Sequence, residues 1–199
     1  MKPLIAASAA VALLAASAPA LAASGDWRQD ARPEDAHRLG RLDEAWTTAL
    51  RQARASGFAR DVARLGALAQ PRAALPRPEP APGPWRCRTV KLGSPGGQGL
   101  NFVAYGWFRC RVELTPGGDL ILEKTTGSQR PRGHLYPQSR TRQVFLGAVA
   151  WGDDAAAVYG RDPERDQVGV FERIGRQRYR LVLPFPKQES TLDIIELAR

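Results

Sequence analysis

Two cysteines, each flanked by arginines, are the residues of this chain whose types and spacing could do chemistry together. They lie in segments 85–88 and 108–111, and a Gly/Ser/Pro-rich turn separates them. Around each cysteine the side chains alternate as on a β-strand. We therefore predict two neighbouring antiparallel strands joined by a Cys87–Cys110 disulfide, which would add roughly 3 kcal/mol in the chain-entropy model.

The flanking arginines would share the opposite face of this strand pair with Trp107. If the two cysteines lie directly opposite each other, Arg86 faces Arg111, and Arg88 faces Arg109. Like charges that face each other destabilise a sheet. Nearby glutamates, stacking on tryptophan or solvation could offset this repulsion, and a bound anion or acidic partner is the alternative. These four arginines and the tryptophan form the candidate partner patch.

Three charged residues fall on predicted inward-facing positions of the β region. Alternation places Lys91 on the side of Cys87, and it places Lys124 and Glu172 among apolar neighbours. A buried lysine or glutamate must find a partner or change its protonation state. Either these residues form satisfied ion pairs in the core or at a barrel rim, or they line a ligand cavity as its orienting polar groups.

Catalytic and metal-binding patterns are weak. Ser128 and His134 lie close in sequence, but no Gly-x-Ser-x-Gly elbow accompanies them, so a hydrolase is the last of our hypotheses. His37 and His134 are the two histidines, and no closely spaced cysteine pair exists, so we expect no zinc site. The acidic residues between 153 and 166 lack calcium-loop spacing, and we predict a salt-bridged surface loop there. We expect no metal and no cofactor.

The elements that must position these residues begin with a helical hairpin, predicted within residues 23–72. Pro33 suits a first helical turn, and apolar residues that include Trp46 recur at three- and four-residue intervals up to a stop at Gly57. We expect this stripe to pack on the β region, and a partner-binding arm is the alternative. Residues 73–84 are rich in proline and predict an extended linker at a domain boundary.

From residue 85 to residue 199 the apolar period changes to two, which predicts β-strands. Eight short strands joined by tight turns suit a sheet that closes on itself. The predicted class is α+β, with a helical hairpin followed by an antiparallel, eight-stranded, lipocalin-like β-barrel braced by the disulfide. An open sandwich is the alternative. The expected strands are residues 85–92, 102–114, 120–126, 132–136, 142–151, 167–174, 178–183 and 192–197.

The first residues indicate a compartment. Lys2 precedes an apolar stretch, and Ala20-Leu21-Ala22 fits the small-x-small cleavage rule. We predict a signal peptide over residues 1–22 and a mature chain that is periplasmic or secreted. A membrane anchor is the alternative, but the apolar stretch is short for a span of ~20 residues. No later segment is long and apolar enough to cross a bilayer.

The chain carries a formal net charge of +9, with 25 arginines and four lysines. Because an exported protein meets little nucleic acid, this excess indicates anionic envelope surfaces or acidic partners. Enrichment in arginine and alanine also follows from GC-rich coding, which is the plainer explanation.

Six short motifs of the β region form one joint pattern: Arg86-Cys87-Arg88 with Lys91-Leu92-Gly93, Phe108-Arg109-Cys110-Arg111, Gly127-Ser128-Gln129-Arg130-Pro131, Val144-Phe145-Leu146-Gly147, Tyr159-Gly160-Arg161-Asp162 and Arg180-Leu181-Val182-Leu183-Pro184. Together they resemble a family of small secreted bacterial proteins known only as a domain of unknown function. The likeness covers residues 26–197, including the helical hairpin. It implies no activity, substrate or site residue.

Three classes of function follow from these patterns. The first is a non-enzymatic periplasmic binding or interaction protein that uses its barrel interior or its Arg/Trp outer face for an anionic or amphipathic partner. The second is an inhibitor or accessory partner of an envelope enzyme. The third is a hydrolase or other enzyme centred on Ser128, His134, Lys124 or Glu172. For the first two classes, the expected partner is an anionic envelope component or another periplasmic protein, not nucleic acid.

Overall fold

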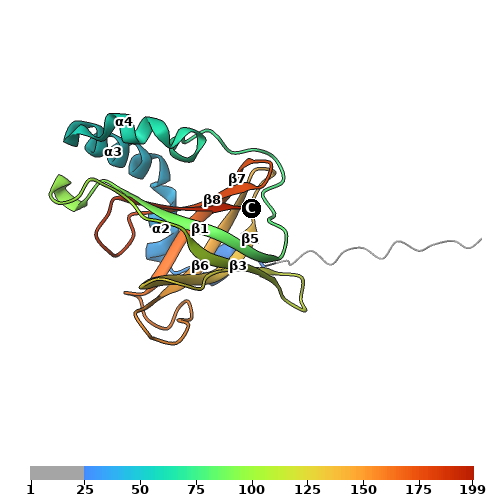
Figure 1. Cartoon of the computed structure of the whole chain (residues 1–199). Helices are drawn as coiled ribbons and strands as arrows, with labels where there is room; N and C mark the ends of the chain where they lie inside the picture. The colour runs from blue at the N-terminus through green and yellow to red at the C-terminus, as the bar shows by residue number, and fades with distance from the viewer. Residues whose placement is uncertain (1–24) are drawn as a thin grey trace, which may run out of the picture.

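The computed structural model of this protein describes residues 25–199, in which short helices lead into a closed antiparallel β-barrel (Figure 1). The predicted signal peptide, residues 1–22, lies outside the described residues. Within the described part, no helix is long and apolar enough to span a bilayer. The helices are α1 Trp27–Asp30, α2 Pro33–Gly40, α3 Leu42–Ala53, the π-helical η1 Arg54–Phe58, α4 Ala59–Arg64 and the 3₁₀ turn η2 Gly66–Ala69.

Eight strand positions close the barrel, which confirms the predicted architecture. From β3 onwards each strand pairs antiparallel with the next, and β1 pairs with β9 to complete the ring. One position is shared, because β2 and β3 both pair with β1. The strands are β1 Gly83–Leu92, β2 Phe102–Ala104, β3 Phe108–Leu114, β4 Leu120–Lys124, β5 Gln129–Pro137, β6 Arg142–Trp151, β7 Asp166–Gly175, β8 Arg178–Pro184 and β9 Leu192–Ala198, and the 3₁₀ turn η3 Pro95–Gly97 follows β1.

The helices form a layer on the outside of the barrel (Figure 1). Helix α2 starts at Pro33 as expected, but Arg41, with φ −96° and ψ 18°, separates it from α3. Gly57, with φ +90°, marks the turn before α4. The apolar stripe of α3 packs on the outer wall, where Trp46 lies in one core cluster with Val90 and with residues of β7, β8 and β9.

The predicted disulfide is present, but the register around it differs from the prediction. Cys87 and Cys110 are bonded with a Cα–Cα distance of 5.7 Å. They are diagonal neighbours, since Cys87 lies opposite Phe108 and Trp85 lies opposite Cys110. Arg86 therefore faces Arg109, and the predicted pair with Arg111 is wrong. A disulfide tolerates Cα–Cα distances of about 4.4–6.8 Å, so the bond alone does not select one register.

Side chains fill most of the barrel interior. Phe145, Phe171, Leu181 and Leu197 are fully buried there, in a cluster that also contains both cysteines. Gly147 makes room for one of these rings, because a Cβ at this position would lie 2.4 Å from the Phe145 ring. A pocket of about 160 Å³ remains at one end of the barrel.

The proline-rich segment lies against the barrel as an extended strap. The Leu75 amide donates to the Arg173 carbonyl at 2.8 Å, and the Tyr179 hydroxyl donates to the Glu79 carbonyl at 3.2 Å. The extended conformation agrees with the composition of residues 73–84. A domain boundary at this segment stays a prediction.

Candidate functional site

A groove crosses the outer face of the barrel where β3, β1, β9 and β8 lie side by side. The strand registers align Arg109, Arg86, Ala198 and Arg178 in one row. Because Ala198 has the smallest side chain of the row, a depression is left between its neighbours. The groove has a volume of about 580 Å³ and is lined by Arg86, Trp107, Arg176, Gln177, Arg178, Glu196, Ala198 and Arg199.

Positive charge dominates this groove. The Arg86 guanidinium lies 4.4 Å from the centre of the Trp107 ring, and that of Arg88 lies 5.1 Å away. Glu196 accepts hydrogen bonds from Arg88, at 2.6 Å, and from Arg178. In the described part of the chain, Arg86 and Arg176 have no carboxylate partner. The tryptophan ring offsets part of the repulsion by cation–π attraction, but the excess of cations persists.

The structure brings together part of the predicted patch and adds residues that the sequence did not reveal. Arg109 is the end residue of the row described above, while Arg111 lies beside Glu113, 3.1 Å away. Arg176, Arg178 and Arg199 were not predicted. Alternation on β8 indicates that Arg178 points outward, but only the β1–β9 pairing shows that it approaches β1.

A second site lies at one end of the barrel interior, where Lys91 and Lys124 point inward as alternation predicts. We call it the mouth pocket, and its volume is about 160 Å³. The Lys91 ammonium donates to the Gln129 side-chain oxygen at 3.1 Å and to Glu189 at 2.9 Å. Lys124 donates to the Gln129 carbonyl at 2.8 Å. The lining residues are Thr89, Lys91, Tyr105, Phe108, Lys124, Ser128, Gln129 and Glu189.

Backbone strain and close packing hold this pocket in shape. Glu189 has a φ of +53°, which is unfavourable for a residue with a side chain. Gly127 has a φ of +92°, and a Cβ there would lie 2.7 Å from the Lys124 ammonium. Glycine at this turn therefore allows the lysine to reach its position over the Phe108 ring, 3.9 Å from the ring centre.

The pocket shifts the pKa values of its charged groups. Burial, together with the cations Arg130 and Lys91, lowers the pKa of Lys124 to about 8. Burial acts in the same direction on Lys91, but Asp193 and Glu189 outweigh it and leave its pKa above the ordinary value. Burial raises the pKa of Asp193 to about 6, although Lys91 and a hydrogen bond from Ser190 oppose this shift.

Glu172 does not belong to this pocket, which corrects the prediction that it points into the barrel. It shares the outer face of β7 with Val170 and Ile174, which pack in the core under the helices. Phe171, on the other face of β7, fills the interior. Because both faces of this strand are buried, alternation shows which residues share a face but not which face points inward.

On that outer face, charges alternate across five neighbouring strands. The registers place in one row Arg88, Glu196, Arg180, Glu172 and Arg142. Glu172 accepts from Arg180 and from Arg142, each at 2.6 Å. This row of ion pairs satisfies the charges under the helices and leaves Glu172 no role in ligand binding.

Of the four candidate hydrolase residues, Ser128 and Lys124 line the same pocket, but His134 and Glu172 lie elsewhere. Ser128 borders the mouth pocket, whereas His134 lies on the outer face of β5, opposite Leu146. His134 lines a different hollow, with Tyr136 and Tyr159. Lys124 faces the interior and Glu172 the exterior. The structure therefore does not assemble these side chains into one catalytic group.

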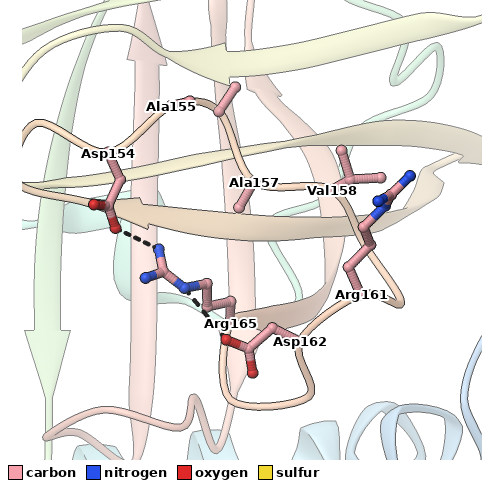
Figure 2. Close-up of a pocket in the computed structure, with 8 residues that line it drawn as sticks. Asp154, Ala155, Ala157, Val158, Arg161, Asp162 and Arg165 are labelled. Atoms are coloured by element: carbon pink, nitrogen blue, oxygen red, sulfur yellow. Dashed lines mark hydrogen bonds and ion pairs between the residues drawn. The ribbon is translucent and has the colours of Figure 1, made fainter.

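The loop between β6 and β7 carries a shallow hollow of about 490 Å³, shown in Figure 2. Arg165 pairs with Asp154 at 2.7 Å and lies 3.4 Å from Asp162. The loop is thus the salt-bridged surface loop that the sequence predicts. Across residues 25–199, no group of three or more His, Cys, Asp or Glu side chains is arranged to hold a metal ion.

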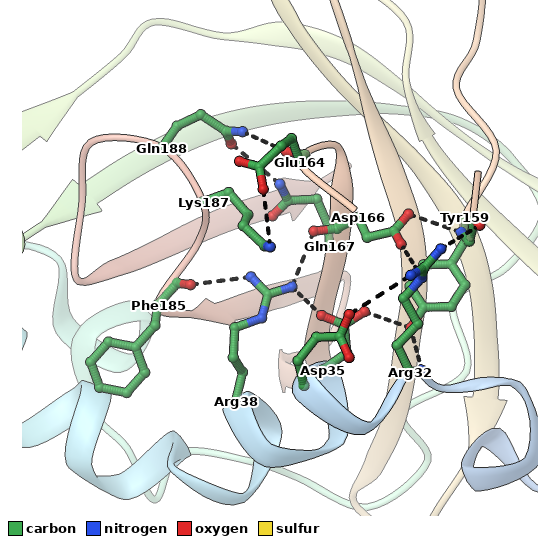
Figure 3. Close-up of polar contacts among 12 residues, drawn as sticks. Arg32, Asp35, Arg38, Tyr159, Glu164, Asp166, Gln167, Phe185, Lys187 and Gln188 are labelled. Atoms are coloured by element: carbon green, nitrogen blue, oxygen red, sulfur yellow. Dashed lines mark hydrogen bonds and ion pairs between the residues drawn. The ribbon is translucent and has the colours of Figure 1, made fainter. Parts of the chain in front are cut away.

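The start of α2 is attached to this loop by buried acidic residues (Figure 3). Asp35 pairs with Arg38 and accepts from the Tyr159 hydroxyl at 2.6 Å. Asp166 lies 2.9 Å from Arg32, and burial raises the pKa of its carboxyl. Both carboxylates are paired with arginines, and Asp35 also accepts a hydrogen bond from a hydroxyl group, so we assign them a structural role.

Comparison with known proteins identifies a family without a described activity. No curated protein and no solved structure matches this chain, so the lipocalin-like character of the barrel stays a prediction. The family match covers the helical layer and the barrel together. Residues 27–197 match the family described as Domain of unknown function (DUF4893), and the chain belongs to that family.

Proposed function

We propose that this protein is an exported, non-enzymatic binding protein that holds an acidic glycan of the cell envelope in the outer groove. Export rests on the predicted signal peptide at residues 1–22 and is supported by the disulfide, because disulfides persist in oxidising compartments. The glycan would lie across β1, β9 and β8.

One observation carries this proposal: four arginines line the groove and one glutamate opposes them. Arginine presents a planar fork of donors that matches carboxylate and phosphate groups. Glu196 is already shared by Arg88 and Arg178, so it cannot neutralise Arg86 or Arg176. An anionic ligand would supply the missing negative charge.

The shape of the site favours a glycan over a membrane surface. The floor of the groove at Ala198 is recessed between rows of longer side chains, and a flat bilayer would not reach it. Trp107 is 44% exposed at the edge, where its ring can pack against the C–H face of a sugar. A chain of uronic acid residues offers both a ring and a carboxylate in each unit.

Titration calorimetry with a galacturonic acid oligomer tests this proposal. The variant Arg86→Ser/Arg176→Ser removes two groove cations without breaking an ion pair, and we expect each substitution to weaken binding roughly tenfold. Arg54→Ser/Arg60→Ser is the charge-matched control, since both arginines are exposed on the helical layer. Binding should also weaken with added salt.

Equal affinity of the groove variant and the wild type would contradict the proposal. Binding of a neutral galactose oligomer with the same affinity would also contradict it, because the charge would then be irrelevant. Vesicles that contain phosphatidylglycerol form a separate arm. If they bind through the same arginines while the acidic oligomer does not bind, the partner is a lipid surface and the glycan proposal is wrong.

A further inference from the structure

The mouth pocket holds a cation that the fold leaves without a counter-charge. Lys124 is 4% exposed, and its ammonium contacts the Gln129 carbonyl and the face of the Phe108 ring. In the described part of the chain it has no carboxylate within ion-pair distance. Leaving a buried ammonium unpaired is costly, so this arrangement needs an explanation.

The second lysine of the pocket shows how a carboxylate is held there. Lys91 pairs with Glu189 at 2.9 Å and lies 4.0 Å from Asp193. Its charge is therefore satisfied from within the fold. Both carboxylates near the two lysines lie at Lys91, so Lys124 is the ammonium that has no counter-charge beside it in the described part of the chain.

The size and polarity of the mouth pocket restrict which ligand could supply a counter-charge to Lys124. A volume of about 160 Å³ holds about five water molecules at ~30 Å³ each. Three residues with hydroxyl groups, Thr89, Tyr105 and Ser128, line the pocket together with the two lysines. A compact ammonium with three donors suits a small anion in such a space better than the broad guanidinium of arginine. The cations that line this pocket are both lysines, although arginines far outnumber lysines in the chain.

We propose that the mouth pocket binds a small monocarboxylate, of about the size of acetate or a short hydroxy acid, whose carboxylate pairs with Lys124. The hydroxyl groups of the lining would contact its second oxygen or its hydroxyl. This site is separate from the groove, because it opens at the end of the barrel interior and the groove lies on the outer wall.

Titration with sodium acetate tests this inference, with sodium chloride at equal ionic strength as the reference. We expect acetate to raise the melting temperature of the wild type and to raise the pKa of Lys124, read from the NMR signals of its side chain. In Lys124→Met the affinity for acetate should fall about tenfold or more. Lys187→Met is the matched control, because Lys187 lies outside the pocket and pairs with Glu164 at 3.5 Å.

A second variant tests the same pocket while it retains Lys124. Ser128→Leu places a larger apolar side chain at the exposed edge of the pocket and retains the lysine, so acetate binding should be lost through occlusion. Unchanged acetate binding in Lys124→Met or in Ser128→Leu would overturn the proposal. An identical response to acetate and chloride in the wild type would overturn it as well.

The same variants distinguish binding at the mouth pocket from binding at the groove. Arg86→Ser/Arg176→Ser should bind acetate as the wild type does, whereas Lys124→Met should bind the galacturonic acid oligomer as the wild type does. Binding of inorganic phosphate without binding of acetate would show that the pocket takes a different oxoanion and would contradict the assignment to a carboxylate.

Discussion

Arg180 and Glu172 face each other across β8 and β7 and form an ion pair in which neither side chain reaches solvent. The Arg180 guanidinium also donates to four carbonyls at and just after the end of the helical region, those of Ala67, Leu68, Gln70 and Pro71. Carbonyl groups at a helix end have no donor within the helix. This arginine therefore ends the helical layer and attaches it to the barrel wall.

We expect Arg180→Met to destabilise the protein by about 3–5 kcal/mol, because Glu172 would keep a buried charge and the helix-end carbonyls would lose their donors. Urea denaturation measures this change. Arg60→Met, an exposed substitution in α4, is the control and should stay within about 0.5 kcal/mol of the wild type. A loss for Arg180→Met as small as that of the control would show that the pair is dispensable.

The lowered pKa of Lys124 predicts how stability changes in mildly alkaline solution. The folded-state pKa of about 8 lies below the ordinary value of 10.5, so the unfolded chain binds more protons between these pH values. From this group, the free energy of unfolding rises with pH across that window. Lys124→Met should abolish this rise, which unfolding curves recorded between the two pH values would show.

At pH 7 the same substitution should stabilise the protein. Each pKa unit corresponds to ~1.4 kcal/mol, and the lost hydrogen bond to Gln129 is worth ~1 kcal/mol, which leaves a net gain of about 2 kcal/mol. The measurement is made without carboxylate ions in the buffer. A clear loss of stability would mean that the ammonium is a structural donor whose charge costs the fold little.

The raised pKa of Asp193 predicts the opposite pH dependence of stability in acidic solution. Its folded-state pKa of about 6 lies above the ordinary value of 3.8, so the folded state binds the extra proton. The stabilising contribution is complete below about pH 4 and is lost as the pH rises to about 6. Asp193→Asn should therefore become more stable relative to the wild type as the pH rises from 4 to 6. Asp153→Asn, on an exposed loop, should show no such trend.

The disulfide should contribute about 3 kcal/mol, since it closes a loop across a sequence separation of 23 residues. We expect Cys87→Ala/Cys110→Ala to lower the free energy of unfolding by this amount while the circular dichroism of the barrel persists. Because the variant lacks both thiols, a reducing agent should not change it further. Equal stability of the variant and the oxidised wild type would refute the estimate.

The sequence predicted much of the barrel because its strands follow simple rules. Alternation around Cys87 and Cys110 correctly grouped Lys91 and Lys124 on the inner face, and turn residues separated the strands. The closed ring and the disulfide followed from the strand count and the two cysteines. Local patterns were sufficient for the strands and turns because these depend on neighbouring residues in the chain.

Features that depend on contacts between distant strands escaped prediction. The diagonal position of the disulfide required the register of β1 and β3, which a bond of adaptable length does not determine. Glu172 was placed on the wrong face because the helical layer buries the outer side of β7. The contribution of Arg178 to the groove required knowledge that β9 lies between β8 and β1.

Strand β9 ties the proposed groove site of this protein to the completion of folding. It contributes Ala198 and Glu196 to the groove and Asp193 to the surroundings of Lys91. Its pairing with β1 joins residues as distant as Arg88 and Glu196, which are 108 positions apart. Contacts between such remote segments form late and slowly. A chain that has not yet docked β9 would lack the floor of the groove and the carboxylate of Asp193 near Lys91, so binding at the proposed groove site would require a fully folded barrel.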